Sequence, residues 1–328
     1  MENRDFLTKN GMRKYLDNPK YWSLLAGVVF CLSYHGFPDF PQWGQYVFFV
    51  FFVVVLGIPH GALDHLVEEK YVNRTNKDFS FRGFLLRYLF QMLAYAVLWY
   101  FFPAISLLVF LGFSAWHFGE SDLNPAPSHW LWSLSQWLLG GSVLVFILLR
   151  EPALTGDLMH RITQENETVQ SAWAWIARNQ WPVLGGLAGI FVAAAGGAQL
   201  VKPRKFEMEK AAALFLFMAV LYFMPLLPAF ALYFGGWHSV NTFQHISGFL
   251  GGIKKPGAPK ANLWLAALPL TGVALVFLVF LGWIWQRIFS GTDPLPILFI
   301  FIAIITLPHL QVMGRMLAYG RDEPRPSA

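Results

Sequence analysis

Histidines with apolar neighbours are the residues of this chain most able to do chemistry. They occur in the strings Gly-Ile-Pro-His60-Gly-Ala-Leu-Asp64-His65, Ser-Ala-Trp-His117-Phe-Gly-Glu120-Ser-Asp122, Gly-Trp-His238-Ser239-Val-Asn241-Thr242 and Thr-Leu-Pro-His309-Leu. An ionisable side chain at membrane depth costs roughly 3 kcal/mol or more unless it has a partner. Several of them in one apolar chain therefore indicate a functional site.

The composition identifies the class of protein. Of the 328 residues, 56% are hydrophobic and only 13% are charged, whereas soluble domains carry about 25% charged residues. Apolar stretches follow one another along the chain, which predicts an all-α polytopic membrane protein. The net charge of +5 does not indicate nucleic-acid binding, because basic residues of membrane proteins mainly set their orientation. The single cysteine, Cys31, cannot form an internal disulfide.

Apolar windows of about 17–25 residues predict about eight to ten transmembrane helices in a bundle. They lie near 21–38, 44–64, 84–101, 104–119, 130–149, 181–200, 211–226, 228–250, 262–286 and 294–316. Most of the 24 Lys and Arg residues then fall on one side of the membrane, so the positive-inside rule predicts that both termini are cytoplasmic. We expect an N-terminal tail over 1–20, one integral membrane domain over 21–318 and a C-terminal tail over 319–328, in a multi-pass plasma-membrane protein.

This topology gives the histidines a common direction. The second, fourth, eighth and tenth predicted spans all run toward the cytoplasm, and they carry His60, His117, His238 with His245, and His309. A cluster at one level of the bundle would explain the shared direction and similar depth. Each histidine taken alone has a plainer explanation, because an intramembrane histidine can simply hydrogen-bond across a helix interface.

Several neutral imidazoles in a dry pocket suit a metal ion such as iron, copper, zinc or nickel. Helical spacing limits which groups can share the ion. Asp64 follows His60 by four residues and Glu120 follows His117 by three, so each pair shares a helix face if the helix continues through it. Asp64 is then either a ligand or an acceptor for the second ring N–H of His60. Pro59 and Gly61 predict a local break in the helix there.

The spacing of His238 and His245 leaves their roles open. Seven residues bring the two side chains to nearly one helix face, but roughly 10.5 Å apart along the axis. Two imidazoles that bind one ion at about 2.1 Å each can only just bridge that distance. Either the helix is distorted between them or one of the two is not a ligand.

Four strings together resemble a known family. Pro-His60-Gly-Ala-Leu-Asp64, His117-Phe-Gly-x-x-Asp122, Tyr-Phe-x-x-x-His238-Ser and Thr-x-Pro-His309 are similar, in this order and across most of the chain, to the Brp/Blh family of membrane-bound β-carotene 15,15'-dioxygenases. The resemblance implies oxidative cleavage of β-carotene, or a related carotenoid, by O₂ at its central double bond into two retinal molecules. It also implies a non-haem Fe(2+) with ligands at His60, His117 and His238.

The fourth ligand departs from the family pattern. The family has a second histidine four residues after the His-Ser histidine, whereas this chain has Thr242 there and its next histidine is His245. His245 through a helix distortion, His309 or water are the alternatives, with His245 placed slightly ahead. We expect Asp64, Glu120, Asp122 and His309 to lie around the ligands, with the carboxylates fixing the histidine tautomers.

A carotenoid is an apolar rod about 30 Å long, close to the thickness of the hydrocarbon core, so we expect it to arrive sideways from lipid. Trp116, Phe118 and Trp237 adjoin ligand histidines and are the aromatic residues expected to contact it. Two other functions fit the same residues. A di-metal desaturase or hydroxylase would use the carboxylates as further ligands, and a transporter or proton relay would also bury His, Asp and Glu. We infer no protein partner and no nucleic-acid partner.

Overall fold

The computed structural model of the protein describes residues 18–75, 77–123, 129–204, 207–251, 262–288 and 295–322. Within these ranges it contains helices and no strand, which confirms the predicted all-α fold. The first half comprises α2 (Pro19–Gly36), α3 (Gln42–Val50), η2 (Phe51–Gly57), α4 (Ile58–Gly61), α5 (Asp64–Arg74), α6 (Phe81–Phe101), α7 (Pro103–Leu123), α8 (Trp130–Leu148) and α9 (Pro152–Ile162). The second half comprises α10 (Glu167–Arg178), α11 (Gln180–Val201), α12 (Met208–Tyr222), α13 (Leu226–Ala231), η3 (Leu232–Ser239), α14 (Val240–Gly251), α15 (Leu263–Ile288) and α16 (Leu295–Asp322).

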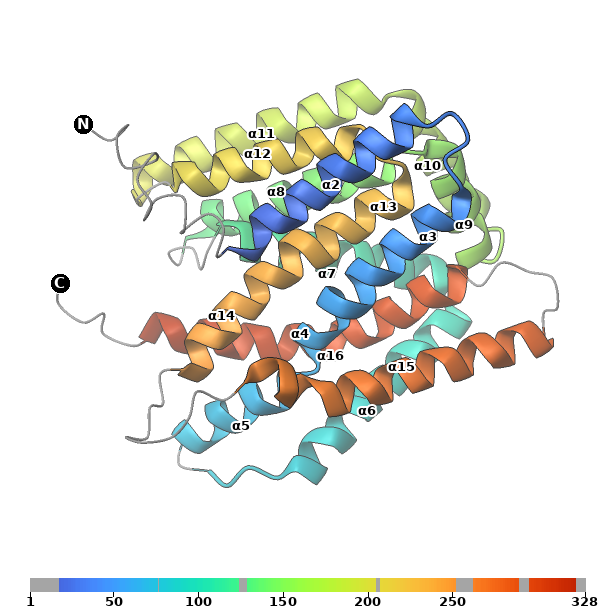
Figure 1. Ribbon diagram of the computed structural model, residues 1–328. Helices are drawn as coiled ribbons and strands as arrows, with labels where there is room; N and C mark the ends of the chain where they lie inside the picture. The colour runs from blue at the N-terminus through green and yellow to red at the C-terminus, as the bar shows by residue number, and fades with distance from the viewer. Residues whose placement is uncertain are drawn as a thin grey trace.

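Six helical segments of the described residues are long and apolar enough to cross a membrane: Gln42–Arg74, Phe81–Phe101, Trp130–Leu148, Gln180–Val201, Leu263–Ile288 and Leu295–Leu317. Spans were also predicted over α2, α7, α12 and the α13–α14 segment. These helices are too short or not apolar enough to count among the six. In α7, for example, the acidic residues Glu120 and Asp122 lie in the last turn. α2 begins and α16 ends at the same end of the bundle (Figure 1). The predicted 1–20 and 319–328 tails lie mostly outside the described residues.

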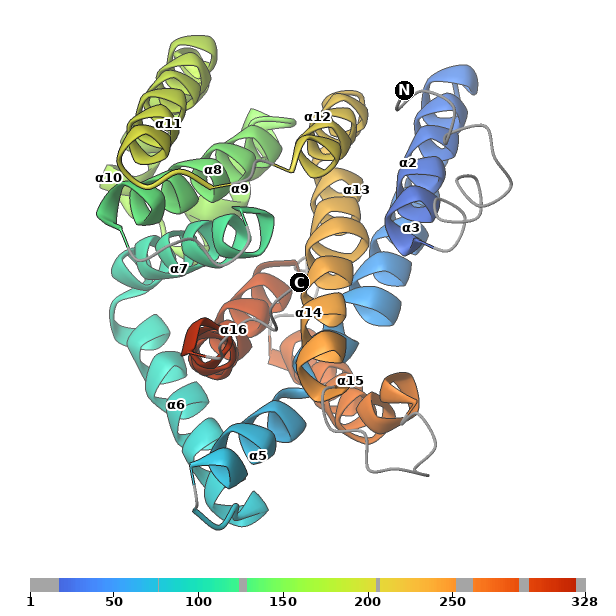
Figure 2. The same ribbon diagram turned by 90° about the vertical axis from the view of Figure 1, so that its left-hand side faces the viewer.

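α16 occupies the middle of the bundle. It contacts α5, α6, α7, α9 and α15, and the view along the bundle shows it between α6, α7, α14 and α15 (Figure 2). His309 lies on this central helix and is buried. The C-terminal helix is therefore placed to complete a site built from the earlier segments.

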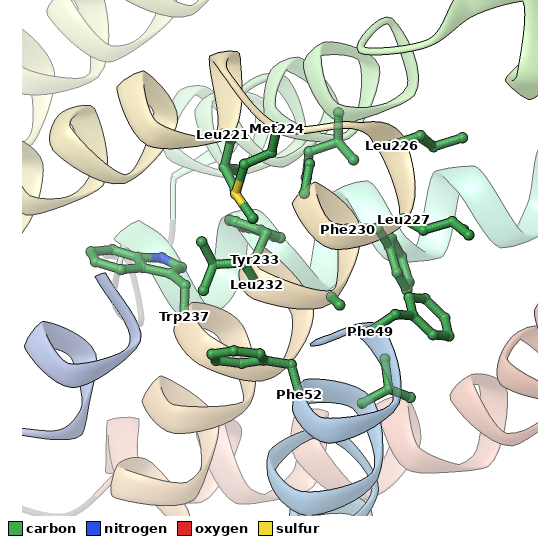
Figure 3. Close-up of a cluster of buried hydrophobic side chains, with 14 of the residues drawn as sticks. Phe49, Phe52, Leu221, Met224, Leu226, Leu227, Phe230, Leu232, Tyr233 and Trp237 are labelled. Atoms are coloured by element: carbon green, nitrogen blue, oxygen red, sulfur yellow. The ribbon is translucent and has the colours of Figure 1, made fainter. Parts of the chain in front are cut away.

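The largest apolar cluster packs the η3 region against α3, η2 and α12. Figure 3 shows its side chains, among them Phe49, Phe52, Leu221, Tyr233 and Trp237. Burying large apolar and aromatic side chains lets the helices pack closely, which holds helices together in a bilayer. This cluster includes side chains of η3, the segment that carries His238, and its packing holds that segment in position.

Two backbone contacts bring the histidine segments close to their neighbours. A Cβ at Gly235 of η3 would lie 2.2 Å from the Phe52 carbonyl oxygen of η2, and one at Gly119 of α7 would lie 1.8 Å from the Gln136 carbonyl oxygen of α8. Only glycine permits such close approach of two helix backbones. His238 and His117 are therefore carried on helices with a tightly fixed separation from their neighbours.

Candidate metal centre

Three histidines from three separate segments meet inside the bundle. His60 lies on α4, His117 on α7 and His238 on η3, and all three are buried. Each offers one ring nitrogen, and the three nitrogens lie within 4.8 Å of one another. A metal ion binds imidazole at about 2.0–2.1 Å, so this spacing suits a shared ion after small side-chain movements.

Two of these histidines lie next to or within a π-helical segment. The π-helical segment η2 ends at Gly57, just before Pro59 and His60, and η3 contains His238. The Ser239 hydroxyl donates to the carbonyl of Phe234, five residues earlier, at 2.7 Å. π-helical turns are rare and occur mostly at functional sites, because the wider turn changes where side chains point. η3 thereby directs His238 toward α7 and α4.

His309 lies beside this group, on the central helix. Its ring centroid lies 4.9 Å from that of His60 and 5.2 Å from that of His117. Its Nδ1–H donates to both carboxylate oxygens of Asp64, at 2.8 and 3.0 Å. The side chain is buried, and its Nε2 has no hydrogen-bond partner among the described residues.

The protein fixes the tautomer of three of these imidazoles. The Nδ1 of His60 contacts the Gly57 carbonyl oxygen, and that of His309 contacts the Asp64 carboxylate, so both nitrogens must carry the proton. The Ser121 hydroxyl donates to the Phe118 carbonyl at 2.9 Å, so the His238 Nδ1–H donates to Ser121 Oγ at 3.1 Å. In all three residues Nε2 then holds the free lone pair, as a metal ligand requires.

Several of the free nitrogens have no hydrogen-bond partner among the described residues. They are both ring nitrogens of His117, Nε2 of His238 and Nε2 of His309, and all are buried. A buried polar atom without a partner costs about 1–3 kcal/mol, and proteins rarely leave several in one place. A bound metal ion would satisfy one nitrogen of each of these histidines, so the residues present fit a metal centre.

His245 lies outside this group. It is half-buried on α14, about two turns beyond His238, and no ring contact joins it to His60, His117 or His238 among the described contacts. His309, which also lies outside the three-nitrogen group, has such contacts. The distortion in η3 ends at Ser239, so the helix between the two histidines is mostly regular and keeps them far apart. Of the sequence alternatives for a fourth imidazole, His309 is the one whose ring contacts the cluster.

The carboxylates expected around the ligands behave differently from one another. The break predicted at Pro59 and Gly61 is present, because α4 ends at Gly61 and α5 begins at Asp64. The pair that would have shared a helix face is thereby separated, and Asp64 accepts from His309 and from the Tyr88 hydroxyl instead of from His60.

Asp122 accepts hydrogen bonds from the Tyr233 hydroxyl at 2.8 Å and from the Trp237 indole N–H at 2.7 Å. Both donors lie on η3, so the carboxylate ties α7 to the segment that carries His238. It does so through aromatic donors, where the sequence predicted a direct bond to a histidine. Glu120 is buried in the same turn of α7.

An apolar cavity of about 390 Å³ adjoins the histidines. His60, His117, His238, His309 and Phe118 line it. The Phe118 ring lies 4.8 Å from that of His238. Cavities of this size and composition bind small apolar molecules.

Trp116 and Trp237 do not line this cavity. Trp116 packs on Trp137 with ring centroids 5.9 Å apart, and Trp237 is fully buried against Phe217 at 5.0 Å. Successive residues on a helix point about 100° apart, so a neighbour of a ligand normally faces a different environment. Adjacency in sequence is the reason these two were expected at the site.

Ser121 and Tyr88 were not predicted to take part. Ser121 holds His238, and Tyr88 holds Asp64. Ser121 lies one turn after His117, and this spacing was the one available signal. Nothing in the sequence marks Tyr88, which reaches Asp64 from a different helix.

The fold and the site together define a membrane-embedded helical protein with a buried histidine centre beside an apolar cavity. A sequence model of the family described as β-carotene 15,15'-dioxygenase matches residues 51–317. The chain therefore belongs to the β-carotene 15,15'-dioxygenase family, as the four motifs indicate.

Two relatives agree with this assignment. A protein named β-carotene 15,15'-dioxygenase from the uncultured marine bacterium 66A03 is 28% identical over 271 residues, which cover 79% of this chain and 89% of the relative. A protein named probable β-carotene 15,15'-dioxygenase Blh from Halobacterium salinarum is 25% identical over 287 residues, which cover 80% of this chain and 81% of the relative. No solved structure matches the chain.

Proposed function

We propose that this protein cleaves β-carotene at its central 15,15' double bond with O₂ and releases two molecules of retinal. Both carbons of the bond become aldehyde carbons, and each aldehyde takes up one oxygen atom, so one O₂ balances each cleavage. The observation that carries the proposal is the set of buried histidines with free nitrogens at the wall of an apolar cavity. Membership of the β-carotene 15,15'-dioxygenase family supports the substrate and the bond.

The proposed cofactor is a single Fe(2+) held by His60, His117, His238 and His309. When bound, the iron would supply the activation of O₂. The ring contacts and the Asp64 bond of His309 support it as the fourth ligand in place of His245. The protein contributes neutral imidazoles in fixed tautomers and a dry cavity that holds the polyene beside them.

One ion agrees better with the carboxylate contacts than two. Asp122 is committed to Tyr233 and Trp237, and Asp64 to His309 and Tyr88. The group of possible ligands found among the described residues consists of histidines alone. The di-metal alternative would use these carboxylates as further ligands.

The test is expression in cells that accumulate β-carotene, together with metal analysis of the purified protein. We expect retinal to form, the orange colour to fade, and about one iron per chain. Unchanged pigment with good expression and full iron loading would refute the proposal. Two irons per chain would favour the desaturase type, and no metal would favour transport. We place the protein in the plasma membrane, which fractionation of the same cells checks.

The ligand set has its own test. His309→Ala should lower the iron content of the purified protein, whereas His245→Ala should leave it close to one per chain. The paired variants share the same residue change and differ only in position. Iron loss in His245→Ala with retention in His309→Ala would assign the fourth position to His245.

A further inference from the structure

The wall of the apolar cavity has two parts, which differ in exposure. The buried part of the wall is made of residues from α8, α9, α13 and α16, namely Leu144, Leu158, Met159, Ile162, Phe230 and Ile302. The exposed part of the wall comes from α6 and α15. We call the first part the closed arm and the second part the open arm.

The open arm reaches the lipid-facing surface. Leu89 of α6 and Val273 and Phe277 of α15 line the cavity, yet their exposed fractions are 49%, 64% and 43%. Figure 2 shows α6 and α15 on opposite sides of α16. An apolar substrate dissolved in the bilayer therefore has a lateral route to the histidines.

The closed arm ends at α9. Leu158 and Met159 are only 5% and 8% exposed, and the hydroxyl of Thr155, on the same helix, donates to the Leu148 carbonyl at 2.6 Å. This bond ties α9 to the end of α8. The arm is thus closed by packed side chains on a helix that is fixed in place.

An aromatic row runs along the closed arm from the metal centre. The ring of Phe234 is stacked on His238 with centroids 6.1 Å apart, and Phe230 is stacked on Phe234 at 5.6 Å. Phe299 of α16 meets Phe230 at 5.4 Å. Flat rings along one wall suit a flat, conjugated chain better than a flexible one.

The length of α16 between His309 and the far lining residue Leu298 is close to half the length of a carotenoid. On α16 the lining residues Ile302 and Leu298 lie on one face with His309, and Leu298 is about three turns, or roughly 16 Å, from the histidine. A carotenoid about as long as the hydrocarbon core is thick, roughly 30 Å, has halves of about 15 Å. A polyene has no polar group at its centre, so a stop at one end is the available way to fix its position.

We propose that the closed arm measures the substrate from one end. One half of the carotenoid enters it until the ring end meets Leu158 on α9, and this stop places the central double bond at the histidines. The inference rests on the proposed function, because it names what selects the bond that is cleaved. Leu158 is then a specificity-determining residue that acts at a distance from the reacting atoms.

The first test uses the unaltered protein and an apocarotenal that keeps one intact half of β-carotene and lacks the end of the other. The apolar ring end should enter the closed arm, since burying the aldehyde there without a partner is costly. Cleavage should then give retinal from the intact half, although that bond is no longer at the middle of the molecule. Cleavage at the new midpoint would overturn the proposal.

The second test changes the stop. Leu158→Ala lengthens the arm, so β-carotene should slide deeper and off-centre products should rise at least about fivefold relative to retinal. Leu158→Phe shortens the arm; with the apocarotenal, whose two ends differ, it should shift the cut in the direction opposite to that of Leu158→Ala. Leu93→Ala is the matched control, because Leu93 is exposed on α6 and does not line the cavity.

Mass spectrometry of the carbonyl products separates the outcomes. Active Leu158 variants that still give only retinal would refute the measuring role while leaving the proposed function intact. An unaltered, iron-loaded protein that forms no aldehyde from either substrate would refute the proposed function itself.

Discussion

Two buried aspartates flank the metal centre and support it in different ways. Asp64 accepts directly from the ring of His309, whereas Asp122 accepts from the phenol of Tyr233 and the indole of Trp237. The first orients an imidazole, and the second orients the helical segment that carries one. Asp64 thus positions a single side chain, that of His309, whereas Asp122 positions the helical segment η3.

The surroundings of the two aspartates explain this difference. Asp64 begins a new helix after the break at Ala62 and Leu63, so its carboxylate faces across to α16. Asp122 lies inside the last turn of α7 and faces the aromatic side of η3. Which donors a carboxylate meets is decided by the neighbouring helix and not by its own sequence motif.

Loss of a histidine ligand should reduce activity and iron content more than any substitution at either aspartate. His238→Ala should reduce retinal formation by more than about 100-fold, because an outer partner alone is worth about 10–100-fold. Iron content measured by elemental analysis should fall with it. Retained activity and iron in this variant would remove His238 from the ligand set.

Asp64→Ala should have the next largest effect. It leaves the His309 Nδ1–H without its acceptor, so iron affinity should drop about 10–100-fold. Competition with a chelator measures this affinity directly. An affinity equal to that of the unaltered protein would show that Asp64 does not position His309.

Asp122→Ala should weaken the protein more than it weakens iron binding. Two buried donors lose their acceptor, and each costs about 1–3 kcal/mol. We expect a lower midpoint of thermal unfolding in detergent and a fall in iron affinity below about tenfold. If iron affinity fell as far as in Asp64→Ala, the contrast between the two aspartates would fail.

Tyr88→Phe should have the smallest effect. It removes one hydroxyl from Asp64 and leaves the bond between Asp64 and His309 in place. A net hydrogen bond of about 1 kcal/mol corresponds to about a fivefold change in iron affinity. A loss as large as that of Asp64→Ala would mean that the hydroxyl, and not the carboxylate alone, sets the orientation of His309.

The sequence predicted the parts of the site that depend on one segment at a time. Runs of apolar residues predicted helices, and the helix break at Pro59 and Gly61 is where the residue types placed it. The motifs around His60, His117 and His238 indicated the three histidines that the structure brings together. These features depend on residue types and spacing within one segment, and the sequence states both directly.

Other parts of the site could not be predicted in this way. His245 is near His238 in sequence, yet His309, seventy-one positions later, is the one that reaches the cluster. Trp116 and Trp237 adjoin ligands and face away from the cavity, while Tyr88 reaches Asp64 from another helix. Each of these depends on how two helices face each other, and spacing within one helix does not contain that information.

The sequence by itself determined an apolar helical chain, its histidine motifs and its family. The tertiary structure alone decided the ring contacts of the fourth histidine, the separate duties of the two aspartates, and a cavity with one closed and one open arm. The physical reason is that glycine contacts such as Gly235 on Phe52 fix the distance between helices, and the π-helical turn at η3 fixes the direction of His238. Both are properties of packed segments, and they appear only when the helices are assembled.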